Sequence, residues 1–115
     1  MTILLDTGAL QTLQELLGDD LLDITQIYAD QVQADVQGIL ACWASADTAQ
    51  LGKLAHALKG GSSNMGATEV ARLAALLEKA AVGQDSATIT SVLDALPGAA
   101  TQTVLALREG GYLRA

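Results

Sequence analysis

The chain has 115 residues and a formal net charge of −7, because 13 acidic residues outnumber 6 basic ones. Half of its residues are hydrophobic but only 3% are aromatic, so we expect one domain with a mostly aliphatic core. The acidic balance argues against binding to nucleic acids or anionic membranes, both of which need a basic surface. With one cysteine and one histidine, the chain lacks the residues for an internal disulfide or a structural zinc site.

The sequence carries no recognisable targeting segment. No basic stretch is followed by the apolar core of a signal peptide, and no apolar run approaches the roughly 18 residues of a membrane span. We therefore expect a cytoplasmic protein.

Apolar residues recur at spacings of three and four through most of the chain, which predicts helices throughout. A short first helix is expected within residues 4–17, ended by Gly18 and lying across the end of a bundle as a lid. The second helix is expected near residues 20–44, with Asp19 or Asp20 as its cap. Its apolar stripe comprises Leu21, Ile24, Tyr28, Val32, Val36, Ile39 and Trp43.

Three further helices are expected near residues 48–64, 68–82 and 86–109. Asp47 and Gln50 resemble a capping box at the start of the third helix, and Thr68 can cap the fourth. Pro97 would normally break the last helix, but apolar residues stay in phase on both sides of it, which favours one kinked helix. The tail after residue 109 is expected to be loose.

These helices predict an all-α fold, an up-down antiparallel four-helix bundle with an additional short N-terminal helix. In the third helix, the apolar side chains of Leu51, Leu54, Leu58 and Met65 lie opposite His56 and must face the core. His56 is therefore expected to point into solvent from the outer wall of the bundle. Such a site would be convex and wet, with no pocket for a small substrate.

His56 shares its helix face with several small or basic residues. At about 100° per residue, Gly52, Gly60 and Ser63 fall within about 40° of it, and Lys53 and Lys59 lie about 60° to either side. Glycine inside a helix costs roughly 0.5–1 kcal/mol, so these glycines indicate that another macromolecule approaches closely. The ammonium groups of the two lysines and the hydroxyl of Ser63 suit an anion, and the anion implied for an imidazole nucleophile is a phosphoryl group.

Simpler interpretations remain open for each of these residues. A single histidine on a helix is usually an ordinary surface residue, and Lys53 and Lys59 could be there for solubility. Gly66 fits a helix-ending residue with positive φ. Gly61 to Gly66 superficially resembles a phosphate-binding loop, but Ala67 stands where that loop needs its lysine and a helix precedes it instead of a strand.

The segment HALKGGSSNMGA resembles the signature of histidine-containing phosphotransfer (HPt) domains, the intermediate carriers of multistep two-component phosphorelays. The resemblance covers essentially the whole chain, as one HPt-like domain of residues 1–115. It implies that His56 is phosphorylated, that Lys59 attends the phosphate and that Gly60 admits the partner. Glu78 occupies the place from which a Gln or Glu of the next helix often reaches back to the imidazole in this family.

A carboxylate at Glu78 would keep the proton on one imidazole nitrogen and orient the ring, which leaves the other nitrogen free to attack. Glu78 could equally be a solvated partner of Lys79 or Arg72. Both interpretations remain open from the sequence.

We therefore expect a phosphorelay intermediate that carries a phosphoryl group on His56 between receiver-domain aspartates. The family resemblance implies a carrier that is not itself an enzyme, binds no metal or cofactor and relies on Mg²⁺ brought by the partner receiver. Response-regulator receivers and hybrid sensor kinases are the expected partners, the chain is expected to be a monomer, and exposed apolar residues of the first two helices are expected to form the docking patch. The alternatives are a non-phosphorylated module that docks on and inhibits receivers or kinases, and a plain structural subunit.

Overall fold

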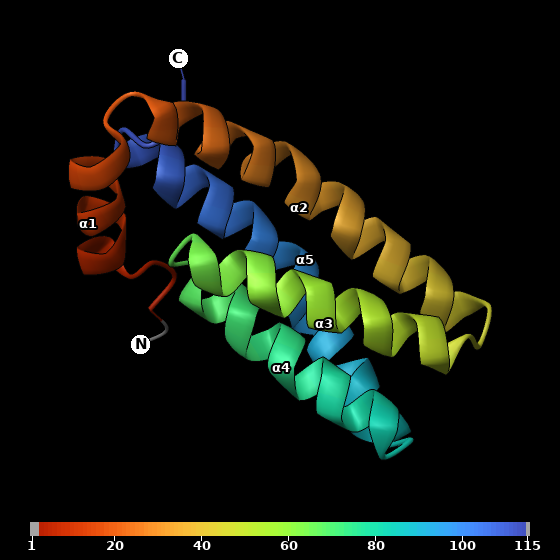
Figure 1. Cartoon of the computed structure of the whole chain (residues 1–115). Helices are drawn as coiled ribbons and strands as arrows, with labels where there is room; N and C mark the ends of the chain where they lie inside the picture. Colours follow the sequence, from red (N-terminus) through yellow and green to blue (C-terminus); the bar gives the residue numbers. More distant parts are fainter. Residues whose placement is uncertain (1–2, 115) are drawn as a thin grey trace.

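The computed structural model describes residues 3–114, and within that range all regular secondary structure is helical (Figure 1). Helices α2, α3, α4 and α5 form the bundle, and each begins and ends at the residues expected from the sequence. The helices are α1 (Thr7–Leu17), α2 (Asp20–Ala44), α3 (Thr48–Asn64), α4 (Thr68–Val82) and α5 (Ser86–Glu109). None of the described helices is long and apolar enough to cross a membrane.

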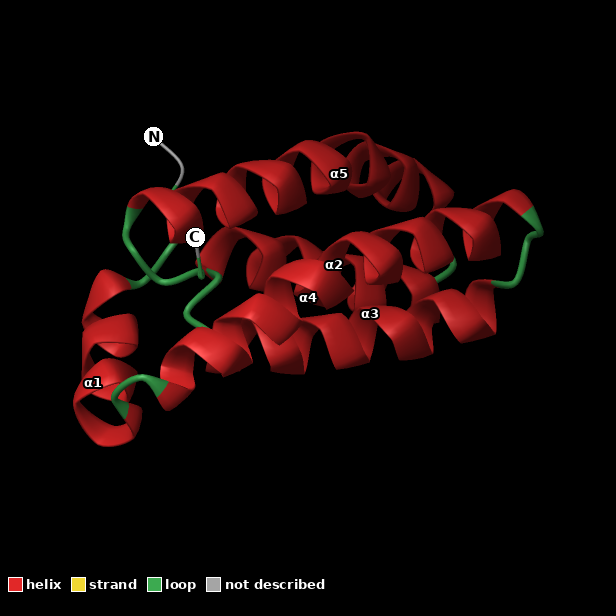
Figure 2. Cartoon of the chain, turned by 90° about the horizontal axis from the view of Figure 1, so that it is seen from above, coloured by secondary structure: helices red, strands yellow, loops and turns green. Residues whose placement is uncertain are grey.

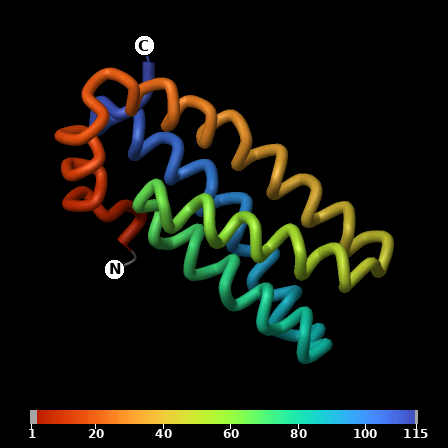
Figure 3. Tube along the Cα trace, in the orientation of Figure 1, coloured from red at the N-terminus to blue at the C-terminus, as the bar shows by residue number. Residues whose placement is uncertain are grey.

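Consecutive helices of the bundle pack against each other, and α5 closes the bundle by packing on both α4 and α2. Helix α3 therefore has α2 on one flank and α4 on the other, with α5 diagonally opposite. Helix α1 lies across one end of the bundle, as expected for a lid, and the chain can be followed from it through the four long helices in Figures 2 and 3. This arrangement leaves the outer side of α3 open to solvent.

Aspartates begin three of the helices by accepting a backbone N–H bond. Asp6 accepts from Ala9, Asp47 from Gln50 and Asp85 from Thr88, at 3.0–3.2 Å. The other two expectations fare differently. Asp19 occupies the N-cap position of α2, as one of the two expected residues, but its side chain makes no capping bond, whereas the expected cap Thr68 is the first residue of α4 and Ala67 precedes it.

The Thr68 hydroxyl does not cap α4, as was expected, but bonds to the N-terminal segment. It donates to the backbone carbonyl of Ile3 at 2.9 Å, and Asp6 N–H donates to the carbonyl of Gly66 at 2.7 Å. Gly66 has φ +69°, and a Cβ there would lie 3.1 Å from the Asp6 carbonyl oxygen. The positive φ expected of this glycine is thus confirmed, and its bare backbone also lets the N-terminal segment dock on the α3–α4 turn.

Apolar residues along α4 and α5 are buried, including Leu77 and Leu96, so one aliphatic core runs through the bundle. Pro97 lies inside a continuous α5, which confirms one helix over two. The stripe of α2 holds at Leu21 and from Tyr28 onward, with Tyr28 and Trp43 half-buried, and it is wrong only at Ile24. There Ile24 is exposed, and Thr25 is fully buried instead.

The C-terminal tail causes this shift and corrects the expectation of a loose end. The chain turns back after α5 at Gly111, which has φ +81°, and Tyr112 and Leu113 are buried in a second apolar cluster with Leu10 of α1. The Thr25 hydroxyl donates to the carbonyl of Tyr112. The same hydroxyl also lies 2.9 Å from the carbonyl oxygen of Leu21, so the polar residue at this buried position of α2 has acceptors both in its own helix and in the tail.

Candidate functional site

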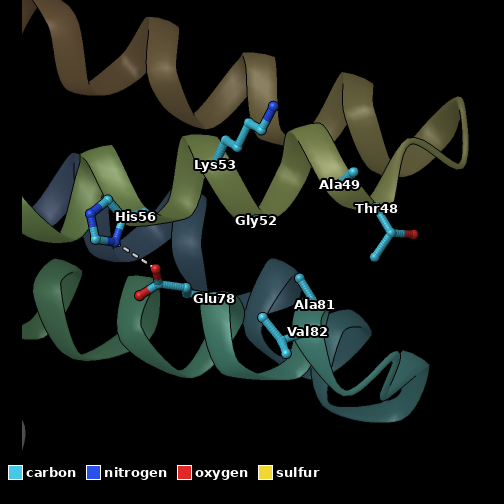
Figure 4. A pocket seen from close by; sticks show the side chains of 8 residues that line it. All are labelled: Thr48, Ala49, Gly52, Lys53, His56, Glu78, Ala81 and Val82. Carbon is cyan, nitrogen blue, oxygen red and sulfur yellow. Dashed lines mark hydrogen bonds and ion pairs between the residues drawn. The ribbon is translucent and has the colours of Figure 1, made fainter.

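His56 lies near the middle of α3 and its side chain is 68% exposed. Ala55 and Leu58 are buried in the core on the opposite side of the helix, so packing turns the imidazole outward. The ring stands above the seam between α3 and α4, where Glu78 of α4 reaches it (Figure 4). The outward orientation expected from the apolar stripe is therefore what the structure has.

The imidazole is held by Glu78, whose Oε2 lies 2.5 Å from Nδ1. The hydrogen bond from Lys59 lowers the pKa of the Glu78 carboxyl, and the bond from His56 adds to this while desolvation opposes it. An ionised carboxylate can only accept a hydrogen bond, so Nδ1 carries the proton. The Nε2 lone pair then faces solvent and is free to attack.

The competing interpretation of Glu78 does not match the geometry. Arg72 pairs with Glu69 instead, through bonds of 2.6 and 3.1 Å. Glu78 is thus directed at His56, and the length of its side chain spans the seam between the two helices.

Lys59 also contacts Glu78, with 2.6 Å between Nζ and Oε1. Its side chain is 37% exposed. The sequence placed Lys59 beside the imidazole as a mobile cation, whereas the structure shows it already paired. One carboxylate therefore holds both the histidine and the lysine.

The glycines of α3 divide into two kinds. A Cβ on Gly52 would lie 3.4 Å from the Cβ of Ala81, an ordinary van der Waals contact, so this glycine faces α4. Its expected role in partner access stays a prediction. A Cβ on Gly60 or Gly61 would have no atom within 4 Å, so nothing in the chain's own packing requires these two.

The other two expected phosphate contacts, Lys53 and Ser63, take no part in the hydrogen bonds that join His56, Glu78 and Lys59. Lys53 is exposed and its side chain leads away from His56 toward α2 (Figure 4). Ser63 is exposed on the same side of α3. Its neighbour Ser62 is the serine in a structural bond, since its hydroxyl lies 2.7 Å from the hydroxyl of Tyr28 in the interior.

A groove of about 460 Å³ runs from His56 along the α3–α4 seam. This corrects the expectation of a convex site without a pocket, and Gly52, which has no side chain, is among the residues that line the hollow. The groove is lined by Thr48, Ala49, Gly52, Lys53, His56, Glu78, Ala81 and Val82. The sequence did not reveal it, since it depends on how α3 and α4 align.

An apolar groove of about 340 Å³ lies on the other flank of α3, against α2. Ile24, Ile27 and Tyr28 line it from α2, and Ala57, the residue after His56, lines it from α3. The Ile27 side chain is 67% exposed. Exposed apolar residues were expected from the first two helices as a docking patch, and Ile24 and Ile27 of α2 are exposed apolar residues in this groove.

Donor groups for a metal are sparse around the site. Among residues 3–114, no three His, Cys, Asp or Glu side chains gather in a way that could hold a metal ion. The groups beside His56 are one carboxylate and one ammonium, a pairing suited to orienting an imidazole and meeting an anion.

A four-helix bundle with an outward imidazole, oriented by a carboxylate from the neighbouring helix, is the arrangement expected of a histidine phosphotransfer carrier. Residues 9–109 match the Hpt domain family model, and the chain belongs to this family. Domains of this family are histidine phosphotransfer carriers, not classical enzymes, and they work with receiver and kinase components of phosphorelays.

Among solved structures, the fold is similar to that of histidine-containing phosphotransfer protein B from Pseudomonas aeruginosa. The TM-score is 0.89 with 23% sequence identity, and the alignment covers 96% of both chains. A search of curated proteins found no significant match.

Proposed function

We propose that this chain relays phosphoryl groups between receiver domains, with His56 as the phosphorylated residue. The observation that carries the proposal is the hydrogen bond between Nδ1 and Glu78, which leaves Nε2 as the free nucleophile on an exposed ring. In the first step the Nε2 lone pair attacks phosphorus, and the bond to the receiver aspartate breaks with its electron pair returning to the carboxylate. The second step is the same exchange in reverse, onto another receiver aspartate.

The division of labour between the partners follows from the site. Transfer through a loose transition state needs in-line positioning and stabilisation of charge on the phosphoryl oxygens. From this chain we assign positioning to Glu78 and charge stabilisation to Lys59, with Ser63 and Lys53 at the edge of the site. We propose that the receiver brings Mg²⁺ and that this chain binds no cofactor of its own.

Gly60 and Gly61 are evidence that another macromolecule approaches this face of α3. They cost helix stability, and the chain's own packing does not use the space they leave. We assign the apolar groove between α2 and α3 to docking of the receiver, because it flanks the imidazole and exposes Ile27.

The test is to incubate the chain with phosphorylated receiver domains and to measure phosphate that is labile to acid and stable to alkali. We expect it on the wild-type chain and not on a His56→Gln variant. A rival role as a receiver- or kinase-docking inhibitor would leave the His56→Gln variant fully active in signalling, and that result would refute the carrier.

A further inference from the structure

Glu78 makes two contacts with its two carboxylate oxygens, to Nδ1 of His56 at 2.5 Å and to Nζ of Lys59 at 2.6 Å. Its side chain is 27% exposed, so the pair is only partly screened by water. The other charged groups nearby contribute less. Lys53 and Lys79 are exposed, and Asp35 of α2 lines the groove on the far flank of α3.

Phosphorylation would add close to two negative charges on Nε2 of the same ring. Lys59 is the cation placed to meet them, but it is already paired with Glu78. Lys59 must therefore divide its charge between the carboxylate and the phosphoryl group, and the carboxylate itself repels that group.

From this geometry we infer that Glu78 keeps the phosphoryl group on His56 labile, so that the chain passes phosphate on instead of storing it. This inference rests on the proposed function and concerns the lifetime of the carrier state. Glu78 acts here as a positioning residue, through the charge of its carboxylate and through the hydrogen bond that it accepts from the Nδ1 proton of His56.

The proton on Nδ1 of His56 makes the phosphoryl group more labile, as the charge of the Glu78 carboxylate does. When the phosphorus–nitrogen bond breaks, its electron pair returns to Nε2. If Nδ1 keeps its proton, the ring leaves as neutral imidazole, and without that proton it would have to leave as an anion. A carboxylate 2.5 Å from Nδ1 favours the protonated nitrogen, and so favours release to water or to an acceptor aspartate.

Glutamine at position 78 separates charge from hydrogen bonding. Its side-chain oxygen can still accept from Nδ1–H, but it carries no charge and holds Lys59 less strongly. We expect the phosphorylated Glu78→Gln chain to live on the order of threefold to tenfold longer than the wild type.

The experiment loads the full chain with phosphoramidate, a small donor that needs no receiver, and then removes the donor. Loss of acid-labile phosphate is followed over a pH series for wild type, Glu78→Gln and Asp94→Asn. Asp94 is exposed on α5, diagonally opposite α3, so its variant matches the change in net charge away from the site. We expect Asp94→Asn to follow the wild type.

If circular dichroism shows that the Glu78→Gln chain folds poorly, a second variant keeps the inference testable. Glu78→Ala removes the carboxylate together with its hydrogen bond, so the phosphate should again be lost more slowly than from the wild type. Equal or shorter lifetime in a folded Glu78→Gln chain, or in a folded Glu78→Ala chain, would overturn the inference. Failure of the proposed function would show differently, as no transfer between phosphorylated receivers and the wild-type chain.

Discussion

His56 faces solvent because its neighbours on α3 point inward, and Gly60 keeps the next turn of the helix bare. A Cβ on Gly60 meets no atom within 4 Å, so Gly60→Ala is expected to raise the free energy of unfolding by about 0.5–1 kcal/mol. Urea denaturation followed by circular dichroism measures the change.

The same substitution at Gly66 is the matched control. Its φ is +69° and a Cβ there would lie 3.1 Å from the Asp6 carbonyl oxygen, so we expect a loss of stability of about 1 kcal/mol or more. If Gly60→Ala also lowers stability, an interaction within the chain requires that glycine, and the case for partner access at Gly60 loses its basis.

Tyr28 couples stability to alkaline pH. Burial raises its pKa from 10.0 to about 12, and the hydrogen bond with Ser62 opposes part of this shift. Because the folded state favours the neutral phenol, the stability it contributes is complete below about pH 10 and is lost as the pH rises from there through 12.

A Tyr28→Phe variant should lack this alkaline loss. At neutral pH it should be less stable by about 1 kcal/mol, since the buried Ser62 hydroxyl loses its partner. Thermal unfolding of both proteins between pH 8 and 12 tests the sign. Identical pH dependence in the two would show that Tyr28 titrates as an exposed phenol.

At the scale of elements, the bounds of the four long helices follow from local chemistry. Asp47 and Asp85 cap α3 and α5, Gly83 and Gly110 follow the last residues of α4 and α5, and apolar periodicity marks the helices between their ends, including α2, which has no capping bond. What the sequence could not predict depends on partners far along the chain. Thr25 and Tyr112 meet across 87 positions, so neither the buried threonine nor the packed tail leaves a local signal.

The tail should therefore contribute measurably to stability. Leu113→Ala is expected to lower the free energy of unfolding by about 2 kcal/mol, because its side chain is buried in the cluster at the α1 end. Arg114→Ala, which removes an exposed ion pair with Asp23, should change it by less than about 1 kcal/mol. Equal effects of the two variants in denaturant titrations would contradict a packed tail.

At the candidate site, too, some features follow from the local sequence and others depend on how distant parts of the chain pack together. Helical geometry predicts the outward His56 and the face it shares with Lys59 and Gly60. The alignment of α3 with α4 decides the rest, namely that Glu78 pairs with both His56 and Lys59 and that Gly52 packs on Ala81. To predict such contacts, one must know which helices are neighbours and how far they are shifted along their axes relative to each other.

For the whole molecule, we place the receiver over α3 and the apolar groove beside it. Ile27→Asp should slow transfer from a phosphorylated receiver by about tenfold or more at low receiver concentration, because it removes an apolar docking contact. Leu105→Asp is the control, since Leu105 is a 47% exposed apolar residue on α5. Equal rates for the two variants would place the docking surface elsewhere.

The central claim is that phosphate is carried on Nε2 of His56 while Glu78 holds Nδ1. Phosphorus–nitrogen correlation NMR of the nitrogen-labelled, receiver-phosphorylated chain tests it most directly. We predict a single phosphorus signal coupled to Nε2 of His56, with the proton on Nδ1. A signal coupled to Nδ1, or phosphate on any other residue, would contradict it.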